Sequence, residues 1–234
     1  MDFVNTLTQE SVLEGQTLLL DKPLGWTSFQ VVNKVRWLLK KKWGFKKLKV
    51  GHAGTLDPLA TGLLIVCTGK MTKQITHFQG LPKTYTGSLL LGATTPSFDL
   101  ETAIDQQFDT SAILPEEIES IRKTFIGTIA QHPPIFSAVK QQGQRLYTLA
   151  RQGEQVQTQA RTVTIQQFDL NTQDFPLLHF EVQCSKGTYI RSLAHDFGKA
   201  LNNGAHLTEL RRTAIGEYHV NNSITVEDFE NQLA

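Results

Sequence analysis

The sequence predicts an α+β fold, a mixed and mostly antiparallel sheet flanked by helices. Short apolar runs typical of strands are interleaved with capped, amphipathic segments typical of helices along the 234 residues. The order lacks the regular strand–helix alternation of a doubly wound parallel sheet. The length suits one large domain or two small ones, with a core that should fold unaided.

A strand, a turn and a helix are predicted near the N-terminus. The apolar run at 17–22 is stopped by a proline and a glycine, which favours a strand followed by a turn. Thr27 or Ser28 can then cap a helix that continues to about residue 39. The apolar side chains of this helix that we expect to face the core are Phe29, Val32 and Val35.

Two strands and a helix follow in the middle of the chain. Residues 63–69 are typical of a buried strand, and 85–95 of another, in which Gly87 and Gly92 indicate bulges or close approaches of the backbone. A helix is predicted from residue 114 to Gly127, because a proline and glutamates occupy its first turn.

The second half contains the clearest helix. Alternating strands at 162–170 and 177–184 precede it, joined by a turn, and a further strand is expected after residue 205. The helix spans about 188–201, and its apolar face consists of Ile190, Leu193, Ala194, Phe197 and Leu201. Thr225 and Asp228 form a capping box for a last short helix.

Composition excludes several classes of protein. With 40% hydrophobic and 19% charged residues, no basic N-terminal signal and no apolar run of about 18 residues, we expect a cytoplasmic protein without membrane segments. Cys67 and Cys184 have no metal-like spacing, and the seven histidines include no pair three or four apart. A protein without a metal is therefore the default expectation.

Charge is unevenly distributed although its net value is only +1. The stretch 34–49 has eight basic residues and no acid, whereas 84–121 has seven acids and no Lys or Arg. A basic face and an acidic face would attract a polyanion locally. An ordinary solvated helix beside an acidic loop explains the same pattern equally well.

The segment GHAGTLDPLATGLL, residues 51–64, places a single carboxylate, Asp57, before a proline. Asp-Pro favours turns, so a purely structural role is the simplest explanation of this dipeptide alone. No second carboxylate suited to a glycosidase lies nearby, and the chain lacks Walker, Rossmann and GxSxG motifs. A catalytic Asp57 would therefore act alone, as a nucleophile.

The same segment resembles the catalytic motif of the TruB family, the tRNA pseudouridine-55 synthases, where 55 counts along the tRNA. Other stretches resemble family motifs in family order: DKPLGWTS, KTY, HPPIFSAVKQQGQRLYTLARQG, CSKGTYIR and GAHLTELRR. The resemblance implies the pseudouridine-synthase fold with a central catalytic cleft over residues 15–216. It also implies a leader at 1–14, an RNA-gripping insertion at about 130–155, and a strand–helix tail at 217–234.

The resemblance assigns roles residue by residue. Asp57 corresponds to the nucleophile, and Arg191 to the arginine that pairs with it. The expected substrate-binding residues are His52, Tyr85, Tyr189 and Leu210. The implied reaction isomerises uridine in the T-loop of tRNA by base flipping, without cofactor, metal or obligatory protein partner. The roles of Lys22, Lys73 and Lys140 stay open, and His206 is expected to be structural.

Two departures from the family pattern accompany this resemblance. Ala53 and Thr55 stand where many members have Thr and Ala, a change between small residues. The chain ends at Ala234, so we expect a short form without the C-terminal PUA-type domain, in which the basic stretch 34–49 carries more of the tRNA affinity. The alternatives are an RNA-binding module that refolds tRNA and a synthase directed to ribosomal RNA by a guide RNA.

Overall fold

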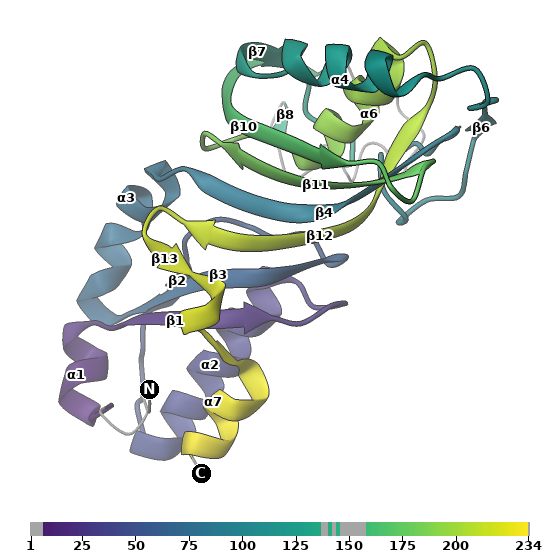
Figure 1. Ribbon diagram of the computed structural model, residues 1–234. Helices are drawn as coiled ribbons and strands as arrows, with labels where there is room; N and C mark the ends of the chain where they lie inside the picture. Colours follow the sequence, from purple (N-terminus) through teal and green to yellow (C-terminus); the bar gives the residue numbers. More distant parts are fainter. Residues whose placement is uncertain (1–6, 137–139, 142–143, 146–157, 234) are drawn as a thin grey trace. The chain divides into compact units, whose positions relative to one another are not determined.

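The computed structural model describes residues 7–136, 140–141, 144–145 and 158–233 (Figure 1). They form two compact units. Unit 1 comprises residues 1–85 and 211–234, and unit 2 comprises 86–210. The chain passes from one unit to the other within strand β4 (Lys83–Leu91) and within strand β12 (Ala205–Ile215).

The strands confirm the predicted α+β class. In unit 1, β1 (Thr17–Lys22) pairs antiparallel with β3 (Ala60–Thr68) and parallel with β14 (Ile224–Thr225), and β2 (Val50–His52) pairs antiparallel with β3. In unit 2, β10 (Arg161–Asn171) lies between β7 (Gly127–Gln131) and β11 (Leu177–Cys184), antiparallel to both. The sheet is thus mixed and mostly antiparallel.

Strand β3 has no solvent face in unit 1. On one side, Leu64 and Val66 pack with the helices α1 (Gln9–Glu14), α2 (Ser28–Trp43) and α7 (Val226–Leu233). On the other side, Leu63, Ile65 and Cys67 pack with Phe78 of helix α3 (Ile75–Gly80). Because both faces are covered, β3 is a rigid base for the loop that precedes it.

Helix α2 differs from its prediction in two respects. It continues to Trp43 and ends at Gly44, whose φ of 67° is left-handed. The expectation that Phe29 faces the core is wrong, since its side chain is 60% exposed. The buried stripe consists of Val31, Val32, Val35, Leu38 and Leu39. At 3.6 residues per turn, Phe29 lies about 120° from the centre of that stripe.

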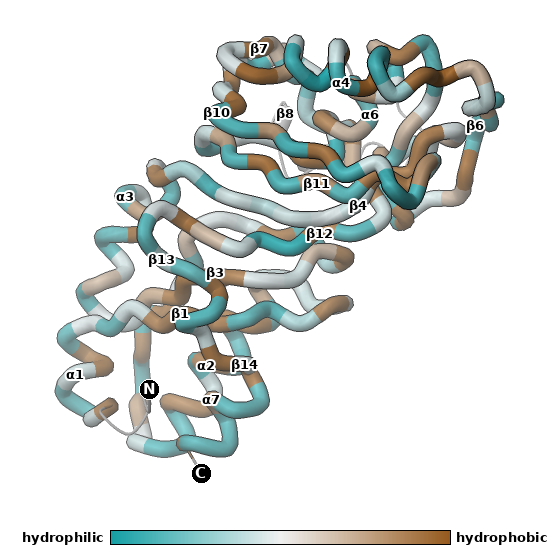
Figure 2. The backbone as a smooth tube through the Cα atoms, in the orientation of Figure 1, coloured by the Kyte–Doolittle hydropathy of each residue, from teal (hydrophilic) through white to brown (hydrophobic). Residues whose placement is uncertain are grey.

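Unit 2 has its own core. Helices α4 (Pro115–Thr124) and α6 (Ile190–Ala200) pack together and α4 packs against β10, and apolar and polar residues alternate along β10 and β11 (Figure 2). Phe168 makes edge contacts with Phe180 and Phe197 in this core. The predicted apolar face of α6 is confirmed, except that Leu201 caps the helix and is half-buried.

The remaining elements are short. They are β5 (Ala93–Thr94), β6 (Gln106–Gln107), β8 (Lys140–Gln141), β9 (Gln144–Arg145), β13 (Tyr218–His219), η2 (Gly69–Gln74) and η3 (Val220–Asn222). Most of the expected RNA-gripping insertion lies outside the described residues. None of the described helices has the length and apolar character needed to cross a membrane.

Candidate active site

Asp57 lies in the loop between β2 and β3 and is half-buried. The backbone N–H of Ala60 donates to the Asp57 carbonyl oxygen at 3.1 Å, which closes a turn around Pro58. At the other end of the loop, the Ala53 N–H donates to the Ile65 carbonyl at 2.9 Å. The loop is therefore anchored to β3 on both sides of the carboxylate.

The loop is also held by the segment that begins α2. The Ser28 hydroxyl, only 2% exposed, accepts from the Leu56 N–H at 2.8 Å and donates to the Leu56 carbonyl at 3.1 Å. The Gly25 N–H donates to the Pro58 carbonyl at 2.8 Å. These contacts satisfy the backbone on both sides of Asp57, so the loop has little freedom to move.

A buried arginine that sequence reasoning missed lies against the same loop. The Arg212 side chain is 1% exposed, and its guanidinium donates to the carbonyls of Leu63 at 2.8 Å, Gly54 at 3.2 Å and Thr55 at 3.4 Å. Gly62 lets the Arg212 backbone lie close to β3, because a Cβ at this position would lie 2.3 Å from the Arg212 carbonyl oxygen. Its position in GAHLTELRR was the signal available in the sequence.

Lys22 places a second buried cation near Asp57. Its side chain has no exposed surface, and Nζ donates to the carbonyls of Pro23 at 2.8 Å and Trp26 at 2.6 Å. Burial lowers the pKa of Lys22 to about 8, the Asp57 carboxylate acts in the opposite direction, and Arg212 lowers it further. The ammonium braces the turn and favours an ionised Asp57.

His52 and Tyr85 are the other expected site residues of unit 1. His52 ends β2 and is half-buried. Burial lowers the pKa of His52, and the positive charge of Arg212 lowers it further, whereas the hydrogen bond with the Gly54 backbone raises it. Because the net effect is a lowered pKa, the imidazole is neutral at neutral pH. Tyr85 lies in β4 and is 9% exposed.

Arg191 lies in the first turn of α6 in unit 2 and is 4% exposed. Its guanidinium donates to the carbonyls of Ser97 at 3.2 Å and Phe136 at 2.9 Å, and Nη1 lies 3.5 Å from Oδ2 of Asp99. Asp99 is 5% exposed and was not singled out from the sequence, where it is one acid among seven.

Tyr189 and Leu210 also belong to unit 2. Tyr189 precedes α6; its backbone N–H donates to Oε1 of Gln131 at 2.7 Å, and its carbonyl accepts from Nε2 of Gln131 at 3.0 Å. Leu210 is half-buried in β12. The six expected site residues thus divide equally between the units. The pairing of Asp57 with Arg191 stays a prediction, since each belongs to a different unit.

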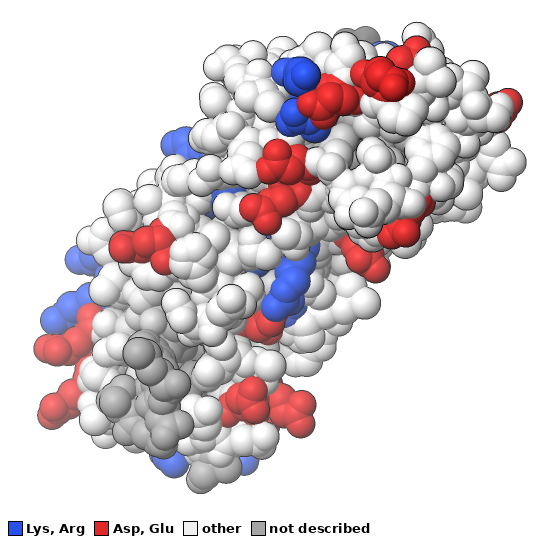
Figure 3. All heavy atoms as spheres, viewed as in Figure 1, with Lys and Arg blue, Asp and Glu red and all other residues white. Residues whose placement is uncertain are grey.

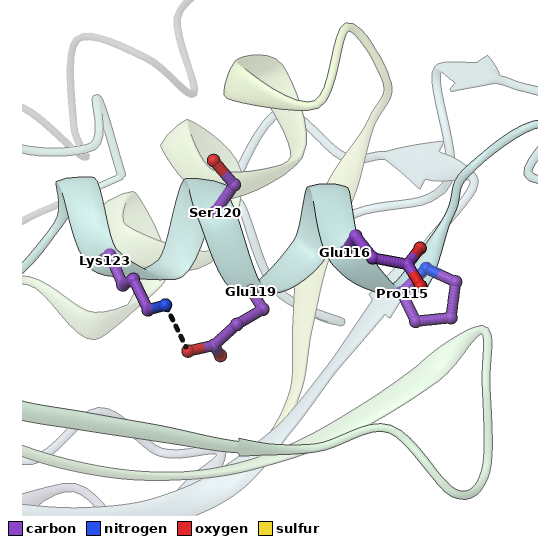
Figure 4. Close-up of a pocket in the computed structure, with 5 residues that line it drawn as sticks. All are labelled: Pro115, Glu116, Glu119, Ser120 and Lys123. Atoms are coloured by element: carbon purple, nitrogen blue, oxygen red, sulfur yellow. Dashed lines mark ion pairs between the residues drawn. The ribbon is translucent and has the colours of Figure 1, made fainter.

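A surface hollow of about 470 Å³ lies along α4 of unit 2 (Figure 4). Its lining includes Glu116 and Glu119, and Glu119 pairs with Lys123 at 3.4 Å. Acidic and basic side chains are interspersed over this helix (Figure 3). None of the six expected site residues lines the hollow, and its carboxylates would repel the phosphates of a nucleic acid.

Comparison with known proteins identifies the family. Residues 40–190 match the N-terminal domain of TruB family pseudouridylate synthase, and 191–234 match the C-terminal domain of tRNA pseudouridylate synthase B. The chain is 58% identical over 228 residues to tRNA pseudouridine synthase B of Flavobacterium johnsoniae, covering 97% of this chain and 100% of the relative. The corresponding protein of Phocaeicola vulgatus is 54% identical, with 94% of each chain covered.

Solved structures agree with this result. The chain is similar to one in the crystal structure of a Cbf5–Nop10–Gar1 complex, with a TM-score of 0.70 and 29% identity. A second match, from an H/ACA RNP bound to a substrate RNA containing 2′-deoxyuridine, has a TM-score of 0.67 and 27% identity. The alignments cover 97% of this chain but only 57% and 56% of those chains. On the sequence matches and the shared fold, the chain belongs to the TruB family of pseudouridylate synthases.

Proposed function

We propose that the protein isomerises a uridine in the T-loop of tRNA, at position 55, to pseudouridine. Membership of the TruB family supports the reaction, and relatives named tRNA pseudouridine synthase B support the substrate. The observation that carries the proposal is Asp57 itself, a carboxylate on an anchored loop beside a buried ammonium. We assign the activity to residues 15–216 and place the enzyme in the cytoplasm, where tRNA is available.

The reaction breaks the bond between N1 of uracil and C1′ of ribose and forms a bond from C5 to the same carbon. The proton leaves C5, and N1 gains one, so the product is an isomer and no cofactor is consumed. Asp57 acts as the nucleophile, which must be ionised. Lys22 supports the ionised form, because opposite charges close together favour each other.

The target base must leave its stack, at a cost of a few kcal/mol. Stacking on an aromatic ring such as Tyr85 returns about 1–3 kcal/mol. In this proposal His52 helps to hold the RNA with the uridine extruded, and Tyr189 and Leu210 line the uridine pocket. An apolar wall there excludes water, which would otherwise hydrolyse a glycosidic intermediate.

Arg191 is the proposed partner of the Asp57 carboxylate, and Asp99 is an orienting residue behind it. A guanidinium can grip carboxylates with parallel hydrogen bonds and keeps its charge at all relevant pH values. The carbonyls of Ser97 and Phe136 and the carboxylate of Asp99 fix the plane of the Arg191 group before any substrate arrives. Such preorganisation supports electrostatic catalysis.

Two other functions are less well supported. A pure RNA-binding module would not need a clamped Asp57 beside a buried ammonium. The alternative of a guide-directed synthase is less well supported, because the chains of the H/ACA structures match at only 26% and 27% identity, whereas the 58% relative is named for tRNA.

The decisive test compares the wild-type protein with Asp57→Asn in multiple-turnover assays on a T-stem-loop transcript. We expect Asp57→Asn to bind the transcript nearly as tightly as the wild type and to form no pseudouridine. Turnover by Asp57→Asn well above background would refute the nucleophile. Absence of turnover by the wild type would refute the proposed function.

A further inference from the structure

Two consecutive residues of the loop before β6 contact two residues one turn apart on α6. Asp99 lies 3.5 Å from the guanidinium of Arg191. The ring of Phe98 stacks on the imidazole of His195, with centroids 3.9 Å apart and planes inclined by 15°. Residues four apart lie above one another on a helix, so Arg191 and His195 share one face.

The backbone of Phe98 explains how neighbouring side chains reach the same helix. In an extended chain, the side chains of consecutive residues point to opposite sides. Phe98 has a φ of 64°, which is left-handed and unfavourable for a bulky aromatic residue. Its carbonyl accepts from Leu207 N–H at 2.9 Å, and its N–H donates to the Thr95 carbonyl at 3.1 Å. Together with the stack, these contacts hold the strained conformation.

Asp99 is oriented by the same loop. Its Oδ1 accepts from the Glu101 N–H at 3.0 Å, while its backbone carbonyl accepts from the hydroxyls of Thr95 at 2.7 Å and Ser97 at 3.2 Å. The other carboxylate oxygen, Oδ2, is the one that meets Arg191. A rotation about Phe98 would carry this oxygen away from the guanidinium.

His195 has the properties of a stacking partner. Its Nδ1 is buried and has no hydrogen-bond partner among the described residues. Burial and, to a lesser extent, the charge of Lys199 lower the pKa of His195, against the opposing carboxylate of Asp105. The ring is neutral at neutral pH and presents its face to Phe98.

We propose that Phe98 and His195 form a positioning pair that holds Asp99 against Arg191 and thereby fixes the guanidinium for the reaction. The importance of Arg191 rests on the proposed function. Neither member of the pair touches the reacting atoms. Loss of the stack frees Phe98 to leave the left-handed conformation, so the Asp99–Arg191 contact loosens while substrate binding is retained.

The test measures kcat and KM of the full chain on a T-stem-loop transcript. Phe98→Gly tolerates the backbone conformation but removes the ring, and His195→Ala removes the other ring. We expect each to lower kcat about 2- to 10-fold, with KM within about twofold of the wild type. His195→Phe retains an aromatic face and should restore most of kcat. Because the two rings form one contact, the double variant Phe98→Gly/His195→Ala should have a kcat no lower than that of either single variant.

Phe125→Leu is the matched control, because Phe125 is half-buried in the same unit and packs on Phe197 of the core. It should lower stability without lowering kcat. The proposal is overturned by wild-type kcat in His195→Ala, by equal losses in His195→Phe and His195→Ala, or by an equal loss in Phe125→Leu. The last result would mean that general destabilisation explains the effect.

A second readout requires no turnover. In the free protein, the guanidinium NMR signals of Arg191, assigned by their absence in Arg191→Lys, should shift and broaden in Phe98→Gly and His195→Ala but not in His195→Phe. Unchanged signals in Phe98→Gly would overturn the positioning pair. Failure of the wild type to make pseudouridine would instead refute the proposed function, whatever the signals show.

Discussion

Ser28→Ala tests whether the loop of Asp57 is held from α2. The substitution removes the hydroxyl that bonds both the N–H and the carbonyl of Leu56, a residue that is 3% exposed. Each buried polar group left without a partner costs about 1–3 kcal/mol. A buried carbonyl tolerates the loss of its hydrogen-bond partner better than a buried N–H group does. We therefore expect Ser28→Ala to lower the free energy of unfolding by about 2–3 kcal/mol, which corresponds to roughly 4–12 °C in Tm for a chain of this size.

The Ser28→Ala substitution should also lower activity. Leu56 adjoins Asp57, and a displacement of about 1 Å at a reacting group can cost about 100-fold in rate. We expect kcat of Ser28→Ala on the T-stem-loop transcript to fall about 10- to 100-fold under conditions in which the protein is fully folded. Binding of the transcript should change little, because the loop backbone, not the RNA-binding surface, is altered.

Thr27→Ala provides the control at the adjacent position. The exposed Thr27 hydroxyl accepts from the Gln30 N–H at 3.1 Å and caps α2, so its loss should cost about 1 kcal/mol of stability. Thr27 makes its capping contacts within the helix and should leave kcat unchanged. If Ser28→Ala keeps wild-type kcat, or if Thr27→Ala loses as much, the loop is not positioned by the Ser28 hydroxyl.

The other predictions concern charge. Changing the exposed residues Lys42, Lys46 and Lys47 to Glu should weaken tRNA binding. The slope of log affinity against log salt concentration should fall by about one unit for each phosphate that is no longer neutralised, whereas Lys123→Glu should leave it unchanged. Equal slopes for the triple variant and the wild type would refute a role for the 34–49 stretch. Burial lowers the pKa of Lys22 to about 8 from 10.5, so the unfolded chain binds more protons between these values and this group's contribution to the free energy of unfolding rises with pH. Denaturant titrations from about pH 7.5 to 10.5 should show this rise, at most about 3 kcal/mol, in the wild type but not in Lys22→Met. Parallel plots of the free energy of unfolding against pH for the two proteins would contradict the prediction.

Local sequence patterns predicted the elements that depend on local chemistry. Thr27, one of the two expected caps, begins α2, although the helix continues past the predicted end at about residue 39 to Trp43. The 3.6-residue repeat identified the buried face of α6. Gly87 was expected to permit a close approach, and a Cβ there would lie 2.1 Å from the Glu209 carbonyl oxygen. The motif around Asp57, which we propose to be catalytic, was equally visible, since its residues are contiguous.

The tertiary structure decided which polar side chains support the site. Arg212 reaches carbonyls about 150 positions earlier in the chain, and Ser28 is 28 residues from Leu56. Asp99 resembles its acidic neighbours in sequence, yet it is buried against Arg191 because the left-handed Phe98 turns it toward α6. Burial of a polar group depends on partners brought together by the whole fold, and no local periodicity records such partners.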